Sequence, residues 1–262
     1  MRIPKLPTII LSLLIAPAWA AGDPAETRGL ELAVEADRRD SGFKDFRAGL
    51  SMLLRNRSGE ESLRHLRVHT LEMADDGDKT LIIFDQPPDV RGTALLTYSH
   101  KQGADDQWLY LPALKRVKRI SSRNKSGPFM GSEFAYEDLA SQEVEKYSYR
   151  YLRDEILEGR EVFVIERDPV DKNSGYTRQE VWLDKEHYYT WKVLFYDRKN
   201  SHLKTLVFSG YQQYLDQFWR AEKMFMENHQ TGKSTLLTWR DYSFRTGLKD
   251  TDFNKNSLKR AK

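Results

Sequence analysis

Short segments in which polar and apolar residues alternate fill most of the chain after residue 42. They are rich in Val, Thr, Tyr, Phe and Trp, which favour strands, and turn-forming runs such as 75–78 and 172–175 separate them. Because consecutive strands with tight turns pair antiparallel, the pattern predicts an antiparallel meander. We expect thirteen strands, at residues 50–56, 63–73, 80–85, 93–99, 107–111, 116–120, 147–157, 161–167, 177–183, 190–196, 204–211, 218–228 and 234–242.

Helical spacing is confined to two places. Residues 24–40 place Leu30, Ala33 and Val34 on an apolar stripe among charged residues, and Ser41-Gly42 ends the pattern. A shorter helix is expected around residues 133–142. The fold class is therefore mainly β with few helices (α+β).

A sheet of this many strands has to curl or close. The segment 218–228 carries bulky side chains on both faces, with Met224 and Met226 on one side and Trp219 and Phe225 on the other. Both faces then need a cover, one inside the curl and one outside it, and the two helices are the available covers.

The first twenty residues have the organisation of a secretory signal peptide. Arg2 and Lys5 precede an apolar run at 9–16 that is too short to span a bilayer, and Ala18-Trp19-Ala20 offers a cleavage site after Ala20. The sequence contains no cysteine, which excludes disulfides, thiol nucleophiles and a lipidation site. We expect a signal peptide at 1–20 and one domain at 21–262, soluble in the periplasm of a Gram-negative bacterium.

Charge is balanced overall and concentrated locally. Lys and Arg number 42 and Asp and Glu 39, so the whole chain is not a polyanion binder. A run of cations at 115–125 resembles a nucleic-acid patch, but export removes that partner. Two interpretations stay open: a charged strand edge that prevents aggregation, or contact with anionic lipid headgroups or an acidic partner through Lys115, Arg116, Lys118 and Arg119.

Catalytic and metal-binding signatures are weak. Nucleotide-binding loops and the hydrolase nucleophile elbow are absent. His65 and His69 lie on one face of an expected strand, roughly 13 Å apart, too far to share a metal. An acid–base set of Glu133, Glu137 and Asp138 is less favoured than acidic residues in the first turn of a short helix. We expect no enzyme activity, catalytic residue, metal or cofactor.

Aromatic and Met residues gather on both sides of the cationic run and on later strands. Most belong in a core, but a curled sheet with a small helical cover does not always fill its concave side. Aromatic and Met side chains suit a flexible apolar ligand there. The residues predicted to line or cover such a cavity are Trp108, Tyr110, Phe129, Met130, Phe134, Tyr136, Leu139, Trp182, Trp191 and Met224.

Several stretches together resemble one known family. They are Asp37-Arg38-Arg39-Asp40-Ser41-Gly42, Trp108-Leu109-Tyr110-Leu111-Pro112, Phe129-Met130-Gly131-Ser132-Glu133-Phe134 and Tyr136-Glu137-Asp138-Leu139, with Glu180-Val181-Trp182-Leu183-Asp184 further on. Over essentially the whole mature chain they are similar to the LolA-like outer membrane lipoprotein-sorting family, a resemblance most specific between residues 108 and 139. It implies an incomplete antiparallel β-barrel around a helical lid, with an apolar cavity between them.

The resemblance also implies a function. LolA carries the acyl chains of lipoproteins through the periplasm, and this chain looks similar to members that accompany RND/MMPL-type lipid exporters. We expect a monomeric carrier of lipid or lipoprotein acyl chains with transient membrane contact, a possible transporter partner of that type and no nucleic acid. The cationic strand and residues 129–139 are expected at the cavity mouth. A counterpart of the lid-locking arginine of LolA is not evident.

The alternative function is an envelope-stress sensor of similar fold. Such a regulator usually carries a further C-terminal domain, whereas this chain ends soon after its last strands. That difference favours the carrier.

Overall fold

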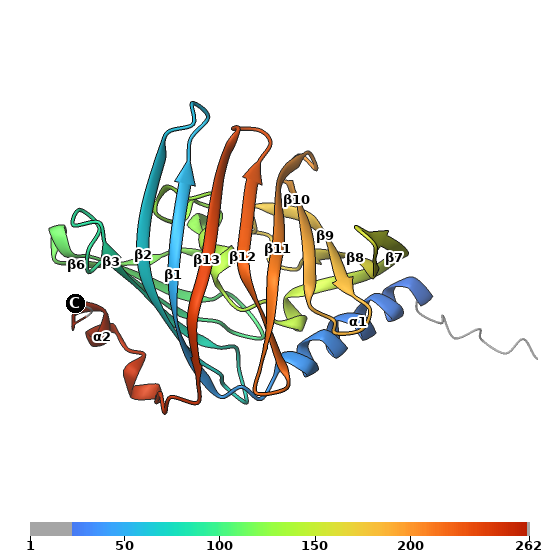
Figure 1. Cartoon of the computed structure of the whole chain (residues 1–262), viewed down its shortest axis with the longest axis horizontal. Coiled ribbons are helices and arrows are strands. Elements are labelled where there is room, and N and C mark those ends of the chain that lie inside the picture. Colours follow the sequence, from blue (N-terminus) through green and yellow to red (C-terminus); the bar gives the residue numbers. More distant parts are fainter. Residues whose placement is uncertain (1–22, 261–262) are drawn as a thin grey trace, which may run out of the picture.

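The computed structural model describes residues 23–260, which form one long helix and a thirteen-stranded sheet (Figure 1). Helix α1 spans Pro24–Asp40 and a short helix α2 spans Lys255–Arg260. The strands are β1 Asp45–Arg55, β2 Glu61–Leu71, β3 Lys79–Gln86, β4 Ala94–Tyr98, β5 Asp106–Leu111, β6 Arg116–Ile120, β7 Tyr147–Leu157, β8 Arg160–Pro169, β9 Tyr176–Asp184, β10 Thr190–Asp197, β11 His202–Tyr214, β12 Phe218–Asn228 and β13 Lys233–Phe244.

All neighbouring strands are antiparallel, in the order β6-β5-β4-β3-β2-β1-β13-β12-β11-β10-β9-β8-β7. The first strand pairs with the last, with Leu50 opposite Trp239. The sheet thus consists of two meanders joined along β1 and β13, and β6 and β7 are its edges. Figure 1 shows β2, β1, β13, β12 and β11 side by side in the front layer, with α1 below and behind them.

One apolar core joins both meanders on the inner face of the sheet, which is the face turned towards α1. Ile120 on β6, Leu50 on β1 and Ile165 on β8 belong to the same buried cluster as Leu32 of α1. The opposite, outer face carries separate, smaller clusters. The predicted antiparallel, mainly β architecture is confirmed by this topology.

Helix α1 begins and is held for identifiable reasons. The Asp23 carboxylate accepts a hydrogen bond from Ala25 N, 2.9 Å away, and Pro24 occupies the first turn, as at many helix starts. Gly29 faces β7, and a Cβ built on it would lie 2.7 Å from the backbone of Arg150. The helix therefore packs against the backbone of an edge strand, which requires glycine at that point.

The connection between β6 and β7 differs from the prediction. Residues 121–146, here called the inner segment, contain only short 3₁₀ turns, at Ser122–Asn124, Phe129–Gly131, Tyr136–Leu139 and Val144–Lys146, in place of the helix expected at 133–142. Met130 adopts a left-handed conformation (φ 49°), which interrupts helical geometry. The segment lies in the interior, where its side chains bond to surrounding strands.

The outer face of β3, β4 and β5 is covered by the chain's own end. Leu248, Phe253 and Leu258 from residues 245–260, the C-terminal segment, pack with Leu96 and Trp108 in one buried cluster. Within residues 23–260, no helix is both long and apolar enough to cross a membrane. The predicted signal peptide at 1–20 lies outside the described residues.

Candidate functional site: a cavity between helix α1 and the inner face of the sheet

A cavity of about 1000 Å³ lies between the C-terminal half of α1, the inner segment and the inner face of the sheet. That volume is at the upper end of the range of about 300–1000 Å³ for small-molecule sites. Most strands contribute alternate side chains to its floor because such residues share one face. The apolar lining includes Ala33, Phe46, Val68, Ile82, Phe134, Leu139, Ile165, Val181, Leu183, Met224, Leu237 and Trp239.

The end of α1 is tied down beside the cavity. The Arg39 guanidinium donates a hydrogen bond to Glu186 O, 2.5 Å away, and lies 4.1 Å from the centre of the Tyr188 ring. Asp40, in the last turn, forms an ion pair with Arg220 of β12. These contacts join α1 to the β9–β10 turn and to β12. Four of the five residues line the cavity, and Glu186 does not.

Aromatic side chains form the wall near this end of α1. The rings of Tyr189 and Tyr211 stack with centroids 3.8 Å apart, and His187 stacks on Trp219 at 4.6 Å. All four line the cavity. Burial raises the pKa of Tyr211 well above its usual range, so this hydroxyl stays uncharged at neutral pH.

Carboxylates gather at another part of the lining, where three elements meet. Asp37 comes from α1, Asp78 from the residue before β3, and Glu143 from the inner segment. Burial, and then the charge of Glu143, raise the pKa of Asp78 from 3.8 to about 7. The same two causes raise the pKa of Asp37. Asp78 therefore changes charge near neutral pH on the polar side of the cavity, away from its apolar floor.

The inner segment is anchored by a buried ion pair. Lys204 Nζ of β11 donates to Asp138 Oδ2 at 2.6 Å and to Glu133 O at 3.0 Å. Tyr176 Oη donates to the other oxygen of Asp138 at 2.8 Å. The Glu133 carboxylate accepts from Asn228 Nδ2 at 2.7 Å. These bonds hold the segment against β9, β11 and β12.

The acidic trio weighed as an acid–base set thus makes hydrogen bonds that hold the inner segment. Glu137, the third member, accepts from Ser174 Oγ at 2.7 Å and from Gly175 N at 2.9 Å. His65 and His69 lie on the outer face, where His65 contacts Ser51. Over the described residues, no group of three or more His, Asp or Glu side chains is placed to hold a metal ion.

Three of the ten residues predicted for the cavity line it: Phe134, Leu139 and Met224. Three others lie in the core near it. Phe129 is fully buried between Phe84 and Tyr136, at centroid distances of 5.6 and 5.7 Å. Met130 is packed against the same core, and its carbonyl accepts from Arg64. Phe129, Met130 and Tyr136 therefore support the cavity wall from behind.

The remaining four predicted residues, Trp108, Tyr110, Trp182 and Trp191, lie on the outer side of the sheet and not in the cavity. On β5, the neighbours of Trp108 point inward: Gln107 donates to Tyr136 O and Leu109 joins the inner core. Trp108 is covered instead by the C-terminal segment, with Lys255 Nζ 4.7 Å from its ring. Trp182 packs in an outer cluster with Trp191. The Trp191 ring also contacts Tyr189 and Tyr211 of the cavity wall, with centroids 5.1 and 5.3 Å apart.

The four predicted headgroup or partner contacts are also away from the cavity. Lys115, Arg116, Lys118 and Arg119 lie on or beside β6, an edge of the sheet, and do not line the space. Arg119 forms an ion pair with Asp106. The cavity mouth was expected between these cations and residues 129–139. The cavity is framed instead by α1 and the β9–β10 turn. Contact of the cations with headgroups or a partner stays a prediction.

Other lining residues were not singled out from the sequence. Asp37, Asp78 and Tyr211 gave no local signal, since each is a polar residue in a polar surrounding. Trp239 and Leu237, at alternate positions of β13, face the same way as Met224 on β12. The alternation of these residues is visible in the sequence and indicates that they share a face. Only the pairing of the strands shows that this face is the inner one.

Comparisons with known proteins agree with this architecture. The model of a family described as an uncharacterized protein matches residues 76–260. A candidate outer membrane lipoprotein-sorting protein domain from Vibrio parahaemolyticus is 62% identical over 89% of this chain and 99% of its own, with a TM-score of 0.88. A DUF1329 family protein from Desulfovibrio piger is 30% identical over the same shares, with a TM-score of 0.84.

A LolA superfamily protein from Nitrosomonas europaea shares the fold, with a TM-score of 0.71 at 20% identity over 87% of this chain and 98% of its own. A search of curated proteins finds no match.

Proposed function

Because the chain belongs to the family of LolA-like outer membrane lipoprotein-sorting proteins, we propose that it is a periplasmic carrier that holds the acyl chains of a lipid or lipoprotein. The sheet then acts as an incomplete barrel, and α1 and the inner segment act as its cover. The observation that carries the proposal is the cavity of about 1000 Å³ with an apolar floor.

The size and lining of the cavity suit an acyl chain. Burying a CH₂ group stabilises by about 0.8 kcal/mol, so about a dozen buried groups would contribute about 10 kcal/mol. After the costs of association this corresponds to affinities of about micromolar. Such affinity lets a carrier both hold and release its cargo, and neither step requires a covalent bond to form or break.

Release requires α1 to move, and its contacts are compatible with movement. The last turn is held by the Asp40–Arg220 ion pair and by Arg39 at the β9–β10 turn. The Asp40 side chain is 57% exposed although Arg220 is only 13% exposed, so water screens the pair from one side and it contributes about 1 kcal/mol. We therefore infer that the C-terminal half of α1 separates from β12 when cargo enters, while Gly29 keeps the N-terminal half against β7.

The cargo moves between envelope membranes in this proposal, with an RND/MMPL-type transporter as the expected donor or acceptor. The family resemblance supports that partner. During transfer, the carrier itself contacts the membrane surface transiently through the cations of β6. A chemical cross-linking experiment in intact cells, with a cross-linker placed at Lys118, tests both contacts.

The first experiment is native mass spectrometry of the protein purified from a periplasmic extract, with lipid extraction of the same sample. A bound phospholipid or acylated species that is lost on denaturation supports the carrier. An unchanged protein mass after incubation with envelope lipids would count against lipid carriage and favour a partner-binding sensor.

A pair of α1 variants ties the binding to the cavity. Ala36 lines the cavity, so Ala36→Trp fills part of it. Val34 is 48% exposed on the other side of the helix, so Val34→Trp is the matched control. We expect A36W to weaken binding of a fluorescent long-chain fatty acid at least about tenfold and V34W to leave it unchanged. Equal binding by both variants would place the ligand elsewhere.

A further inference from the structure

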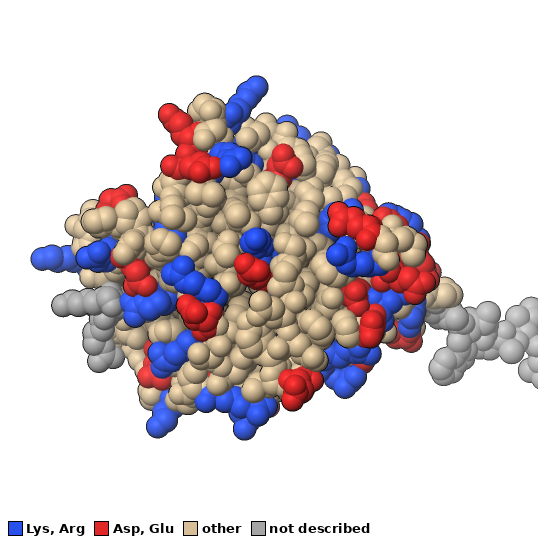
Figure 2. All heavy atoms as spheres, viewed as in Figure 1, with Lys and Arg blue, Asp and Glu red and all other residues tan. Residues whose placement is uncertain are grey.

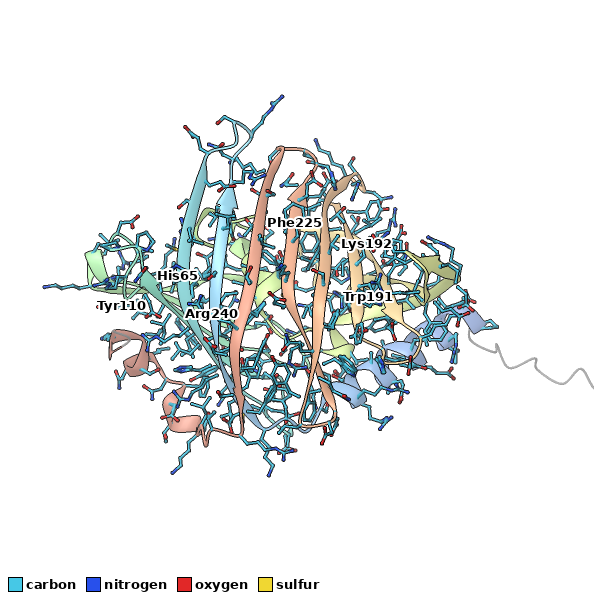
Figure 3. All side chains as sticks on the ribbon, viewed as in Figure 1. His65, Tyr110, Trp191, Lys192, Phe225 and Arg240 are labelled. Atoms are coloured by element: carbon cyan, nitrogen blue, oxygen red, sulfur yellow. The ribbon has the colours of Figure 1, made fainter. Side chains whose placement is uncertain are left out.

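An apolar row crosses the outer face of five neighbouring strands. The registers place Leu63 opposite Leu53, Leu53 opposite Leu236, Leu236 opposite Phe225 and Phe225 opposite Val207. The row thus runs through β2, β1, β13, β12 and β11 with one residue from each. Leu63 is 49% exposed, Val207 41% and Phe225 39%. Figure 3 views this face, with Phe225 labelled.

The chain covers the outer face on both sides of this row but not the row itself. The C-terminal segment packs on β3, β4 and β5. On the other side, Lys192 extends over the Trp182 ring at 3.8 Å, and Trp182 belongs to a buried cluster. Figure 2 shows mostly uncharged atoms over the strands between these flanks. Apolar area left exposed in one contiguous patch commonly marks an interaction site.

The residues on either side of the row determine what can approach it. On each strand, the next residue of the same face lies two positions away. Towards the β1–β2 turn, these flanking residues are Glu61, Arg55, Ser234, Glu227 and Thr205. One step the other way lie His65, Ser51, Thr238, Lys223 and Ser209. Small hydroxyl residues therefore flank Leu236 and Val207 on both sides, which allows another sheet to approach closely.

We propose that the occupant of this row is a second copy of the same chain, in a symmetric dimer with its two-fold axis along the row. Such a rotation places each row residue on its own counterpart and exchanges the two flanks. Lys223 of one copy then faces Glu227 of the other, because both lie on β12, two residues to either side of Phe225. Both side chains are exposed, and neither forms an ion pair within residues 23–260.

The same rotation brings Glu61 opposite His65 of the partner, since both lie on β2 on opposite sides of Leu63. Glu61 already pairs with Arg55 of its own copy, so the charge complementarity of the face rests on Lys223 and Glu227, and it matches the self-complementary pattern of a symmetric interface. A row of five side chains is a small interface core compared with about 800 Å² per partner in stable complexes. The dimer is accordingly weak and concentration-dependent.

The dimer leaves the lipid-binding side free. The row lies on the outer face, whereas α1 and the cavity lie on the inner face. Two carriers joined in this way would present two cavities that face away from each other. The inference concerns a different surface from the proposed function, and does not depend on it.

Sedimentation velocity of the exported protein, from micromolar to hundreds of micromolar, measures the association. Charge-reversal variants then test the proposed dimer. Wild type should shift from monomer towards dimer with concentration. K223E and E227K each place like charges opposite one another twice in the symmetric pair, and each should weaken association at least about tenfold. The double variant K223E/E227K should recover wild-type association, and an equimolar mixture of the two single variants should form a heterodimer.

Two further variants separate this face from others. Phe225→Ser should abolish the dimer without unfolding, because Phe225 is exposed in the monomer. Lys172→Glu, on an exposed turn away from the row, should leave association unchanged. A wild type that stays monomeric over the whole range overturns the inference, as does a dimer that K223E and F225S leave intact.

Discussion

Lys204 and Asp138 form an ion pair inside the protein, with Nζ and Oδ2 2.6 Å apart and their side chains only 4% and 6% exposed. The pair joins β11 to the inner segment across 66 positions of sequence. Asp138 and the next residue, Leu139, both line the cavity, so this contact fixes the position of one cavity wall.

Removing the cation should be strongly destabilising. Lys204→Met leaves Asp138 buried with the Tyr176 hydroxyl and Ala135 N as its remaining hydrogen-bond donors. Loss of one partner from a buried pair costs about 3–5 kcal/mol. We expect a fall of that size in the free energy of unfolding, measured by urea denaturation. Lys233→Met, at an exposed position, is the control. A change below about 1 kcal/mol for K204M would contradict the anchoring role.

The double variant Lys204→Met with Asp138→Asn separates charge from packing. It removes both charges and keeps an acceptor for the Tyr176 hydroxyl. Stability should therefore recover by about 1–3 kcal/mol relative to K204M alone. If the double variant is no more stable than K204M, an uncompensated charge is not the cause of the loss.

This ion pair also shows where sequence reasoning stops. Glu133, Glu137 and Asp138 predict a helix start when only near neighbours are considered, but their partners lie on β12, in the β8–β9 turn and on β11, respectively. Similarly, the alternation in β5 predicts a strand but not which face is inside, since Trp108 and Leu109 are both large and apolar. The C-terminal segment, more than a hundred residues later, decides that Trp108 faces outward.

Elements whose signals lie close together in the sequence are predicted better than elements that depend on distant contacts. Helix α1 spans the expected 24–40 because its cap and its proline are close in sequence. The expected stripe is wrong in part: Leu30 and Val34 are 46% and 48% exposed, and the buried face is made by Gly29, Leu32 and Ala33. Strand β1 begins at Asp45 rather than 50, because Phe46 and Ala48 pack with Phe43 and Phe218 in a cluster that the sequence does not reveal.

Stability should depend on pH through Asp78. Its pKa is raised by burial, and then by Glu143, from 3.8 to about 7. The folded state therefore holds the proton more tightly than the unfolded state between these values. The contribution to stability is complete below about pH 4 and is lost as the pH rises to about 7, at up to about 1.4 kcal/mol per pH unit. Neighbouring carboxylates such as Asp37 act in the same direction.

Asp78→Asn tests this sign. The neutral amide keeps an oxygen for the bond from Met73 N but carries no charge at any pH. At pH 8 we expect the variant to be more stable than wild type by about 1–3 kcal/mol, and at pH 4 about equally stable. The measurement is urea denaturation across this pH range. Parallel profiles for the two proteins would show that Asp78 is not the titrating group.

Gly29 should be intolerant of even a methyl group. Alanine has the better helix propensity by about 1 kcal/mol, but its Cβ would lie 2.7 Å from the backbone of Arg150. Overpacking against backbone costs about 1–3 kcal/mol, and the strand does not yield as a flexible side chain would. Gly29→Ala should therefore lower stability and speed amide exchange along α1. Thr27→Ala, exposed on the same helix, should be neutral or slightly stabilising.

Residues on the two faces of the sheet should separate stability from ligand binding. Trp108 is 8% exposed beneath the C-terminal segment and away from the cavity. Trp108→Ala should cost about 3–5 kcal/mol, in line with other buried aromatic truncations, and leave fatty-acid affinity per folded molecule unchanged.

Met224 lines the cavity and is only partly buried. Met224→Asp places a charge there, so it should weaken fatty-acid binding at least about tenfold with a smaller loss of stability. Binding and unfolding measured on the same preparations decide the point: parallel losses in both variants would mean that the cavity and the outer cluster do not act separately.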